Sequence, residues 1–396
     1  MTQLSDGVAV DLTVPDAPAG PPPAAGTGLA AVVARVADQR SRFEDLRHVP
    51  RDVVADFKAA GIYRAATPRR FGGDALAPAE FLRMVEAISV ADGSAGWVAS
   101  FGQATTYLAA LPLSTQAEIY ADGPDLAFSA GIFPVQPAEV VPDGYLVRGR
   151  WSFASGCVGA DLLGVGISSS VQGIAGKPMV AVLPPSRVEI VDNWDVVGMR
   201  GTGSHDLRVD GVVVDPDWTF VRGGAPTVDE PLYRYPAVPY AAQVLAVVGL
   251  GVARAALDHA AGHGGQRRSL TAGSKAAERP TYRISLARAE ADLRSARAWF
   301  FEAAESVYDT VLRGDDVSRE ENSVLRLSAA HAARVAFSVT QAAYTLGGIG
   351  AIQSAGPMQR LLRDASVVPQ HAFLSESVYD GAGSVFLGAE PFPGYV

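Results

Sequence analysis

Cysteine is nearly absent from this chain, since Cys157 is the single one among 396 residues. One thiol excludes an intrachain disulfide framework and any cysteine-rich metal site, and it fits a reducing compartment, so we expect a cytoplasmic protein. Basic charge is also scarce, because 33 Lys and Arg stand against 42 Asp and Glu. Nucleic acids and anionic membranes need concentrated positive charge, so we expect neither as a partner.

Long apolar runs are missing as well. No uninterrupted apolar stretch reaches membrane-spanning length, and residues 1–18 lack the basic and apolar regions of a secretory signal. We therefore expect neither membrane insertion nor secretion. Residues 15–27 are rich in Pro, Ala and Gly, which bury too little surface to offset the entropy of ordering, so we expect a flexible tail over residues 1–28.

The remainder divides into three regions by hydrophobic periodicity. Residues 29–124 have helical spacing, residues 125–232 hold short Val- and Ile-rich segments separated by turns, and residues 233–396 return to helical spacing. The seam in the last region repeats every three or four residues, as in a bundle, and consists of Leu286, Ala289, Leu293, Ala296, Phe300, Ala303 and Val307. The predicted fold class is α+β, with helical, β and helical domains in that order.

Several helix ends can be predicted from capping residues. Ser94 is a candidate N-cap for a helix that ends at Pro112. Ser318 and Glu321 stand in capping-box register for a later helix, which Gly347 ends.

Three motifs have stronger structural than functional interpretations. GLGVARAA at 249–256 lacks the third glycine of a dinucleotide fingerprint and follows a helical pattern rather than a strand. His259 and His263 have metal-binding spacing but no evident third ligand, so we expect no metal site. Cys157 has no adjacent histidine and is more simply a buried thiol than a nucleophile.

Two other segments are candidates for binding a planar heterocycle. WSFASG at 151–156 combines aromatic rings, hydroxyls and a glycine, and GMRGTGSHD at 198–206 offers backbone amides with the hydroxyls of Thr202 and Ser204. Ordinary β core and a structural turn are equally good interpretations of these segments taken alone.

The order of these segments resembles that of the acyl-CoA dehydrogenase superfamily. FGG near residue 72, WSFASG, WDVVGMRGTGSHDLRVDGVVV, LGGIG at 346–350 and LLRDA at 361–365 carry the resemblance, which covers nearly the whole chain after the tail. It implies an N-terminal helical domain, a middle β-barrel-like domain and a C-terminal four-helix bundle, commonly in a homotetramer with flavin between domains and subunits.

The dehydrogenases carry a catalytic carboxylate shortly after the Arg-Asp pair, where this chain reads PQHAF with His371. Asp380 in YDGAG lies too far along the chain to match that position. The sequence is therefore more similar to flavin-dependent monooxygenases of the same fold, such as the oxygenase components of 4-hydroxyphenylacetate hydroxylases and amino-sugar N-oxygenases. That resemblance implies His371 and Ser155 as catalytic residues.

The resemblance also implies the cofactor and the cosubstrate. The cofactor is reduced FMN or FADH2, delivered by a separate NAD(P)H-flavin reductase because no nicotinamide fingerprint is visible, and O2 reacts through a C4a-hydroperoxyflavin. The expected flavin-binding residues are Trp151, Phe153, Ala154, Ser155, Arg267, Arg268, Gly347 and Gly348. Either Arg267 or Arg268 is expected to grip the phosphate, since a guanidinium binds it through two parallel hydrogen bonds.

The expected reaction is hydroxylation of an aromatic or polyketide-type small molecule. His371 is expected to act as an acid/base near neutral pH, and Ser155 to hydrogen-bond the flavin edge. The expected substrate contacts are Trp97, Phe101, Gln103, Thr202 and His371. N-oxygenation of an amino sugar or amine, and acyl-CoA dehydrogenase-like chemistry, remain as alternatives.

Overall fold

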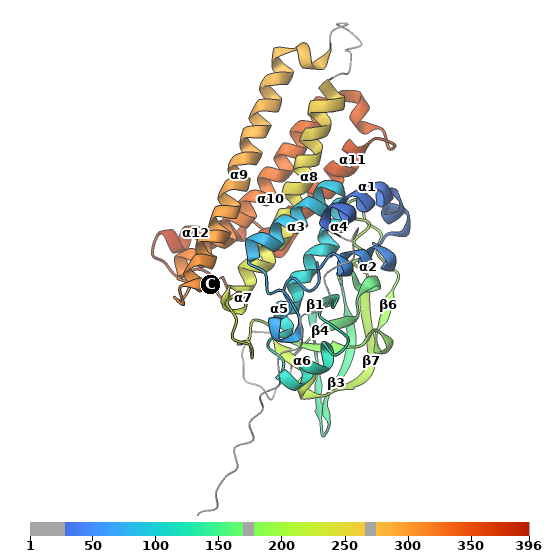
Figure 1. Ribbon diagram of the computed structural model, residues 1–396, viewed down its shortest axis with the longest axis vertical. Helices are drawn as coiled ribbons and strands as arrows, with labels where there is room; N and C mark the ends of the chain where they lie inside the picture. The colour runs from blue at the N-terminus through green and yellow to red at the C-terminus, as the bar shows by residue number, and fades with distance from the viewer. Residues whose placement is uncertain (1–27, 169–177, 266–274, 396) are drawn as a thin grey trace, which may run out of the picture.

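The computed structural model describes residues 28–168, 178–265 and 275–395 (Figure 1). The expected tail therefore lies almost entirely outside the described residues. In Figure 1 the strands form the lower part, long helices rise above them, and the N-terminal helices lie against both.

The N-terminal region is helical, as predicted. Its helices are α1 (Leu29–Leu46), α2 (Arg51–Ala59), α3 (Pro78–Ala91), α4 (Gly93–Ser100), α5 (Thr105–Leu108) and α6 (Leu113–Ile119). The predicted cap at Ser94 is wrong, because the Asp92 carboxylate accepts the Ala95 N–H at 2.9 Å. Ser94 instead accepts a hydrogen bond from the Gly201 N–H.

The middle region forms two four-stranded sheets. The strands are β1 (Phe128–Pro137), β2 (Glu139–Val141), β3 (Gly144–Trp151), β4 (Leu162–Ser168), β5 (Met179–Leu183), β6 (Glu189–Val191), β7 (Asp206–Val214) and β8 (Thr219–Val221). One sheet has the order β1-β4-β5-β8 and the other β2-β3-β7-β6. Only β1 and β4 run parallel among the paired strands described.

The expected barrel-like closure is wrong for the described strands. No ladder joins the edges of the two sheets, three of whose edge strands, β2, β6 and β8, have three residues each. The sheets instead share an apolar core that includes Trp151, Val165 and Leu207. Short edge strands limit further pairing, so a layered arrangement replaces a closed one.

The C-terminal region is helical again. Its helices are α7 (Pro231–Arg234), α8 (Ala237–His259), α9 (Pro280–Leu312), α10 (Arg319–Gly347), α11 (Pro357–Val367) and α12 (Ser377–Phe386). α10 packs against α8, α9, α11 and α12, and α8 also contacts α9 and α11. The capping box is confirmed, since the Glu321 N–H donates to Ser318 Oγ at 3.1 Å and the Ser318 N–H donates to Glu321 Oε2 at 2.8 Å.

The predicted seam of α9 is largely confirmed. Six of its seven residues are buried, and Leu286 packs partly buried against the same core. The glycines of GLGVARAA lie inside α8, where a Cβ at residue 251 would come within 2.5 Å of the Ser89 Cβ. Gly251 therefore allows α3 and α8 to approach closely, which accounts for the motif without a nucleotide.

Two helices are apolar and long enough to cross a membrane by length and composition alone, Ala237–Gly262 and Arg319–Ile352. In the first, 89% of the apolar window is buried inside the protein, and in the second 28% is buried. The first is thus a core helix, packed between the N-terminal helices and the bundle.

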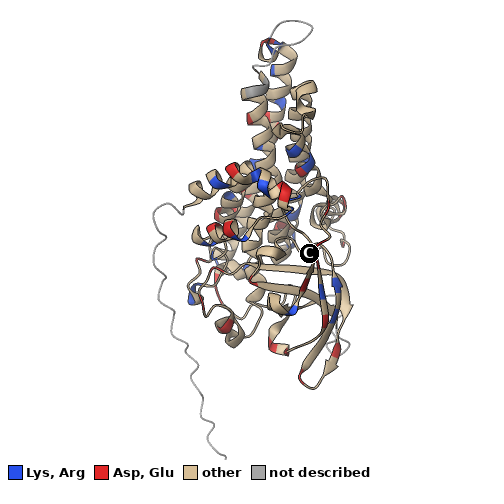
Figure 2. Cartoon of the chain, turned by 90° about the vertical axis from the view of Figure 1, so that its right-hand side faces the viewer, with Lys and Arg blue, Asp and Glu red and all other residues tan. Residues whose placement is uncertain are grey.

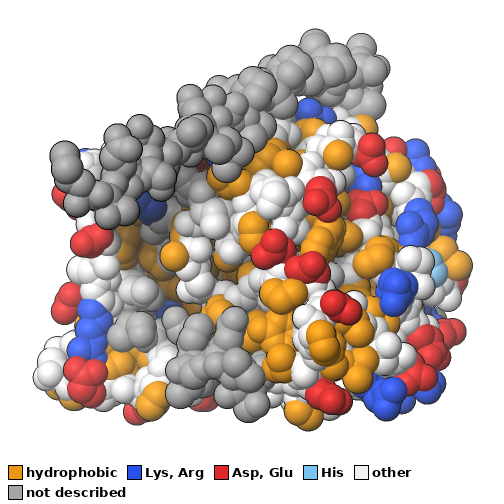
Figure 3. Space-filling model, turned by 90° about the horizontal axis from the view of Figure 1, so that it is seen from below, with side chains coloured by type: hydrophobic (Ala, Val, Ile, Leu, Met, Phe, Trp, Pro, Cys, Tyr) orange, Lys and Arg blue, Asp and Glu red, His pale blue; other side chains and the backbone are white. Residues whose placement is uncertain are grey.

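Charges of both signs are interspersed over the surface. Lys and Arg alternate with Asp and Glu along the helices and strands in Figure 2. Seen from the end opposite the long helices, apolar side chains lie among acidic and basic ones (Figure 3). Such a mixed surface gives no strong field of one sign to attract a polyanion.

Candidate active site

The candidate site begins at the turn that follows β3. Phe153 has a positive φ of 63°, and its ring is 72% exposed while it meets Trp194 edge-on at 6.2 Å between ring centroids. The Ala154 N–H donates to the His205 carbonyl at 3.1 Å, which ties the turn to the segment before β7. The turn thus exposes one ring and buries the next two residues, Ala154 and Ser155.

A directed chain of hydroxyls leads away from Ser155. Thr202 donates its only hydroxyl hydrogen to the Met199 carbonyl at 2.9 Å, because a carbonyl can only accept. Ser204 must therefore donate to Thr202 at 2.7 Å, and Ser155 to Ser204 at 2.7 Å. Ser155 Oγ also accepts the Trp97 indole N–H at 3.2 Å, which leaves this oxygen one lone pair for a further donor.

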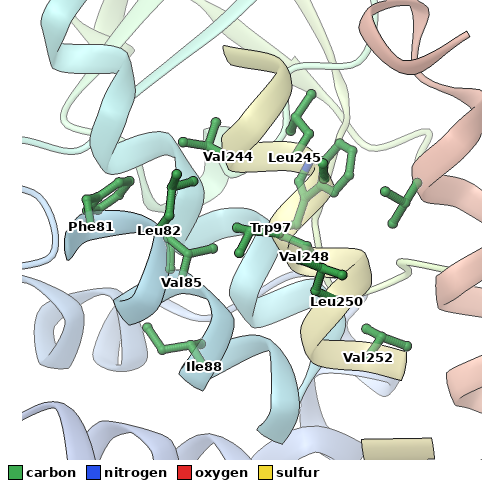
Figure 4. Close-up of a cluster of buried hydrophobic side chains, with 14 of the residues drawn as sticks. Phe81, Leu82, Val85, Ile88, Trp97, Val244, Leu245, Val248, Leu250 and Val252 are labelled. Atoms are coloured by element: carbon green, nitrogen blue, oxygen red, sulfur yellow. The ribbon is translucent and has the colours of Figure 1, made fainter. Parts of the chain in front are cut away.

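Trp97 connects this hydroxyl to the C-terminal helices. It lies on α4, in an apolar cluster between α3 and α8 that includes Val248 (Figure 4). A Cβ at Gly96 would lie 1.9 Å from Ser89 Oγ, so this glycine lets α4 sit close to α3. The ring centroid of Trp97 is 6.1 Å from that of His371. One indole therefore bridges the two residues expected to be catalytic.

His371 has a defined tautomer. Its Nδ1 accepts the Phe373 N–H at 3.2 Å, so in the neutral ring the proton is on Nε2. Burial, and then the positive charge of Arg222, lower the pKa of His371 to about 4. The imidazole is therefore neutral at physiological pH and presents an N–H donor. The expectation that it titrates near neutrality does not hold in this structure, because desolvation disfavours its charged form.

The hydroxyl chain is tied to α11. Asp364 Oδ1 accepts the Met199 N–H at 2.6 Å, and Met199 has a positive φ of 54°. Burial, with the nearby charge of Asp92, raises the pKa of Asp364 to about 7. Arg363 pairs with Glu44 at 3.3 Å rather than with its neighbour Asp364. Asp364 therefore fixes the loop that carries Thr202 and Ser204.

Three residues near His371 were missed by sequence reasoning. Phe373 lies 5.0 Å from His371 between ring centroids. The Arg222 guanidinium stands 4.9 Å from the centre of the Phe373 ring and 6.0 Å from that of Tyr107. Phe373 follows His371 by two positions, so the sequence could have suggested it. Arg222, after β8, and Tyr107, on α5, come close to Phe373 only through the fold.

Some predicted residues lie elsewhere. Trp151 is fully buried and donates its indole N–H to the Gly166 carbonyl at 2.7 Å, so it belongs to the β core. Thr202 is buried within the hydroxyl chain and offers no free surface. Gln103 is buried and donates to Thr106 Oγ1 at 2.8 Å, whereas Phe101 packs between two apolar clusters.

The residues expected to bind the flavin phosphate stay a prediction. Arg267 and Arg268 lie outside the described residues. Gly347 is the last residue of α10 and Gly348 follows with a positive φ of 52°, as expected for a helix stop.

Other titratable candidates are accounted for. Burial raises the pKa of Cys157 to about 12, and its thiol donates to the Gly203 carbonyl at 3.4 Å, so it is an inert core thiol. Asp380 is exposed on α12. Within the described ranges, no three His, Cys, Asp or Glu side chains are placed to hold a metal ion.

A small cavity of about 40 Å³ lies beside the site rather than between Ser155 and His371. Its walls include Tyr107, Gly223, Tyr235 and Tyr240. The Tyr240 hydroxyl is buried without a hydrogen-bond partner among the described residues. Arg222 directly precedes Gly223 in this wall, and its guanidinium carbon lies 6.0 Å from the centre of the Tyr107 ring.

The sequence and the structure were compared with known proteins. The family model for the acyl-CoA dehydrogenase C-terminal domain matches residues 243–376. The chain is 50% identical over 375 residues to indole-3-acetate monooxygenase of Pseudomonas putida, which covers 94% of this chain and 96% of that protein. It is 32% identical to the oxygenase component of FADH2-dependent resorcinol hydroxylase of a Rhizobium species, over 88% of this chain and 90% of the relative.

The fold agrees with these relatives. The crystal structure of 3-HSA hydroxylase from Rhodococcus sp. RHA1 superposes with a TM-score of 0.87 at 27% identity, over 93% of this chain and 98% of that one. Together these matches cover nearly all described elements, so the resemblance seen in the motifs is confirmed. The chain belongs to the flavin-dependent monooxygenases of the acyl-CoA dehydrogenase superfamily, as an oxygenase component that uses reduced flavin and O2 and works with a separate flavin reductase on a small molecule.

Proposed function

We propose that this oxygenase acts on an indole carrying an acetate side chain, the substrate class that the name of its 50%-identical relative states. The contact series Ser155–Trp97–His371 supports the proposal. It places an acceptor, Ser155 Oγ, on one side of the buried Trp97 side chain and an N–H donor, His371, on the other. Aromatic walls at Trp97 and Phe373 suit a planar substrate.

The Ser155 end suits the reduced flavin. Reduced isoalloxazine carries an N–H at N5, and the free lone pair of Ser155 Oγ can accept it. The exposed Phe153 ring offers a flat surface beside this hydroxyl. When bound, the flavin supplies the activation of O2 that no side chain provides. Ser155, Phe153 and the backbone at Ala154 are the residues we propose to hold it.

The His371 end suits the substrate. A neutral imidazole with its hydrogen on Nε2 is a donor, and an indole ring offers it a π face but no lone-pair acceptor. We therefore propose that His371 directs its Nε2–H at the face of the substrate ring and orients the ring, rather than removing a proton. The rings of Trp97 and Phe373 lie next to His371, and we propose that they limit the access of water to this contact. Orientation and dryness are both needed, because water diverts the oxidising equivalents to hydrogen peroxide.

The alternative of acyl-CoA dehydrogenation lacks support in this geometry. Among the described residues, no carboxylate forms a hydrogen bond or an ion pair with His371, Trp97 or Ser155. Asp380, the nearest sequence candidate, is exposed. N-oxygenation of an amine has no specific observation in its favour.

We further propose a cytoplasmic homotetramer. Ile284, Leu312, Ile349, Ile352 and Leu387 are each at least half exposed on the C-terminal helices. They lie near both ends of α9 and around the ends of α10 and α12, and exposed large apolar side chains are commonly covered by a neighbouring subunit. Sedimentation velocity of the purified chain tests this, and a monomer at micromolar concentration would overturn it.

The substrate proposal is tested by supplying the enzyme with reduced flavin. Anaerobic titration with reduced FMN and with FADH2 measures flavin binding. The loaded enzyme is then mixed with O2 and indole-3-acetate, and mass spectrometry detects a product that carries one added oxygen atom. We expect indole-3-acetate to be consumed with little hydrogen peroxide. Equal peroxide release with and without indole-3-acetate, and no oxygenated product, would overturn the proposal.

A further inference from the structure

Arg222 is a partly buried cation without an anionic partner. It follows β8, and its backbone N–H donates to the Pro178 carbonyl at 3.0 Å. Its Nε is buried without a hydrogen-bond partner, and no Asp or Glu in the described ranges forms an ion pair with its guanidinium. By contrast, the partly buried Arg297 pairs with Glu86 at 2.6 Å, and the guanidinium of Arg326 donates to the Tyr395 carbonyl. A desolvated, unpaired cation is costly, so a ligand that pairs with it is favoured.

Two aromatic rings lie beside the guanidinium of Arg222. The guanidinium carbon lies over the rings of Phe373 and Tyr107, at 4.9 and 6.0 Å from their centres. Stacking of this kind uses the flat face of the guanidinium and fixes its plane. The N–H groups point outward in that plane, where a carboxylate can accept two parallel hydrogen bonds. Arg222 is therefore oriented for an anion but holds none from this chain among the described residues.

Arg222 also lies next to the proposed substrate position. One aromatic ring, Phe373, separates it from His371, and the Phe373 N–H fixes the tautomer of that imidazole. The order across the site is then Ser155, Trp97, His371, Phe373 and Arg222, each in contact with the next. A flat aromatic molecule beside His371 would place a short acidic side chain toward Arg222.

We propose that Arg222 is a specificity-determining residue that binds the carboxylate of an aromatic acetic acid while His371 meets the ring. This inference rests on the proposed function and names the group that the site selects. A charged hydrogen bond to the carboxylate discriminates strongly, because a neutral side chain would leave the guanidinium desolvated and unpaired. The enzyme therefore prefers indole-3-acetate to its amide or to indole.

The test compares Arg222→Gln and Arg222→Lys with the wild-type chain. Arg148→Gln is the control, because Arg148 is 71% exposed and pairs only at 3.4 Å with Asp210. Calorimetric binding to flavin-free protein and coupled turnover with reduced flavin are measured for indole-3-acetate, indole-3-acetamide and indole. Circular dichroism and reduced-flavin binding establish that each variant is folded.

We expect Arg222→Gln to weaken indole-3-acetate binding and raise its KM by roughly 100-fold, with little change for the amide or for indole. Arg222→Lys keeps the positive charge but loses the paired N–H donors, so its KM for indole-3-acetate should lie between those of the wild-type chain and Arg222→Gln. Equal losses for all three compounds, or no loss for indole-3-acetate, would overturn the role of Arg222. Absence of turnover by the wild-type chain would instead overturn the proposed function, while the binding data would still decide the role of Arg222.

Discussion

The two ends of the candidate site differ in how their polar groups are satisfied. Around Ser155 every hydroxyl hydrogen has an acceptor, and the chain ends on the Met199 carbonyl. Around Arg222 a buried Nε has no partner among the described residues, and none of those residues accepts a hydrogen bond from Nε2 of the neighbouring His371. The first end is complete before any ligand binds, whereas the second has donors without acceptors.

This difference suggests a division of labour. A satisfied network is rigid and suits a cofactor that must be held in one orientation. Unpaired donors are stabilised only by a ligand with acceptors in the right places, which makes that end selective. Substitutions that disturb one end at a time test whether the other end responds.

The largest effect is expected for His371→Ala at the selective end. Loss of the Nε2 donor should lower the oxygenated product formed per reduced flavin by about 100-fold, as for removal of one fixed donor in other active sites. Reduced-flavin binding should stay within about twofold, because His371 lies across Trp97 from Ser155. Product yield by mass spectrometry and a peroxide assay measure this.

The outcome of His371→Gln sharpens the result. Glutamine keeps an N–H donor but cannot act as a base, so partial recovery of product supports donation. If His371→Gln were as inactive as alanine while Glu or Asp at this position restored product, a base would be required and the donor role would fail.

A smaller effect is expected at Asp364, which fixes the hydroxyl chain. Its folded pKa of about 7 lies above the value of 3.8 for an exposed aspartate. The folded state then binds the extra proton, so the free energy of unfolding should fall as pH rises from 5 to 7, by roughly 2 kcal/mol. Asp364→Asn keeps an acceptor for the Met199 N–H and should flatten this slope.

Urea unfolding between pH 4 and pH 8 measures this slope. Asp380→Asn, on the exposed face of α12, is the control and should leave it unchanged. If Asp364→Asn unfolds with the same pH slope as the wild-type chain, Asp364 does not carry the linked proton.

The smallest effect is expected for Ser155→Ala at the complete end. Removal of one acceptor should weaken reduced-flavin binding by about tenfold, which corresponds to one hydrogen bond. Ser152→Ala, three residues earlier, is the matched control. Anaerobic titration decides between them, and an unchanged dissociation constant for Ser155→Ala would place the flavin elsewhere.

Sequence reasoning reached the order of regions and the superfamily because both depend on local patterns and motif order. The α10 capping box and the α9 seam were predictable for the same reason. The cap at Ser94 failed because Asp92, two residues earlier, competes for the same N–H groups. The burial of Trp151 in the β core was not predictable, because an aromatic at a strand end looks alike in sequence whether it faces a core or a ligand.

The rest of the site depends on contacts between distant segments. Arg222 follows a three-residue strand and has no motif around it, and its relation to Phe373 spans about 150 positions of sequence. The pKa of His371 depends on burial and on that same arginine, neither of which local sequence reveals. Contacts between residues so far apart in the chain leave no periodic pattern in the sequence, so only the folded structure reveals them.

The position of Trp97 has a practical consequence. Its indole touches a hydroxyl on one side and an imidazole on the other, so its fluorescence should be sensitive to arrivals at either end. Emission from a chain in which the other four tryptophans are replaced by phenylalanine would then time cofactor loading and substrate loading separately, with no external dye.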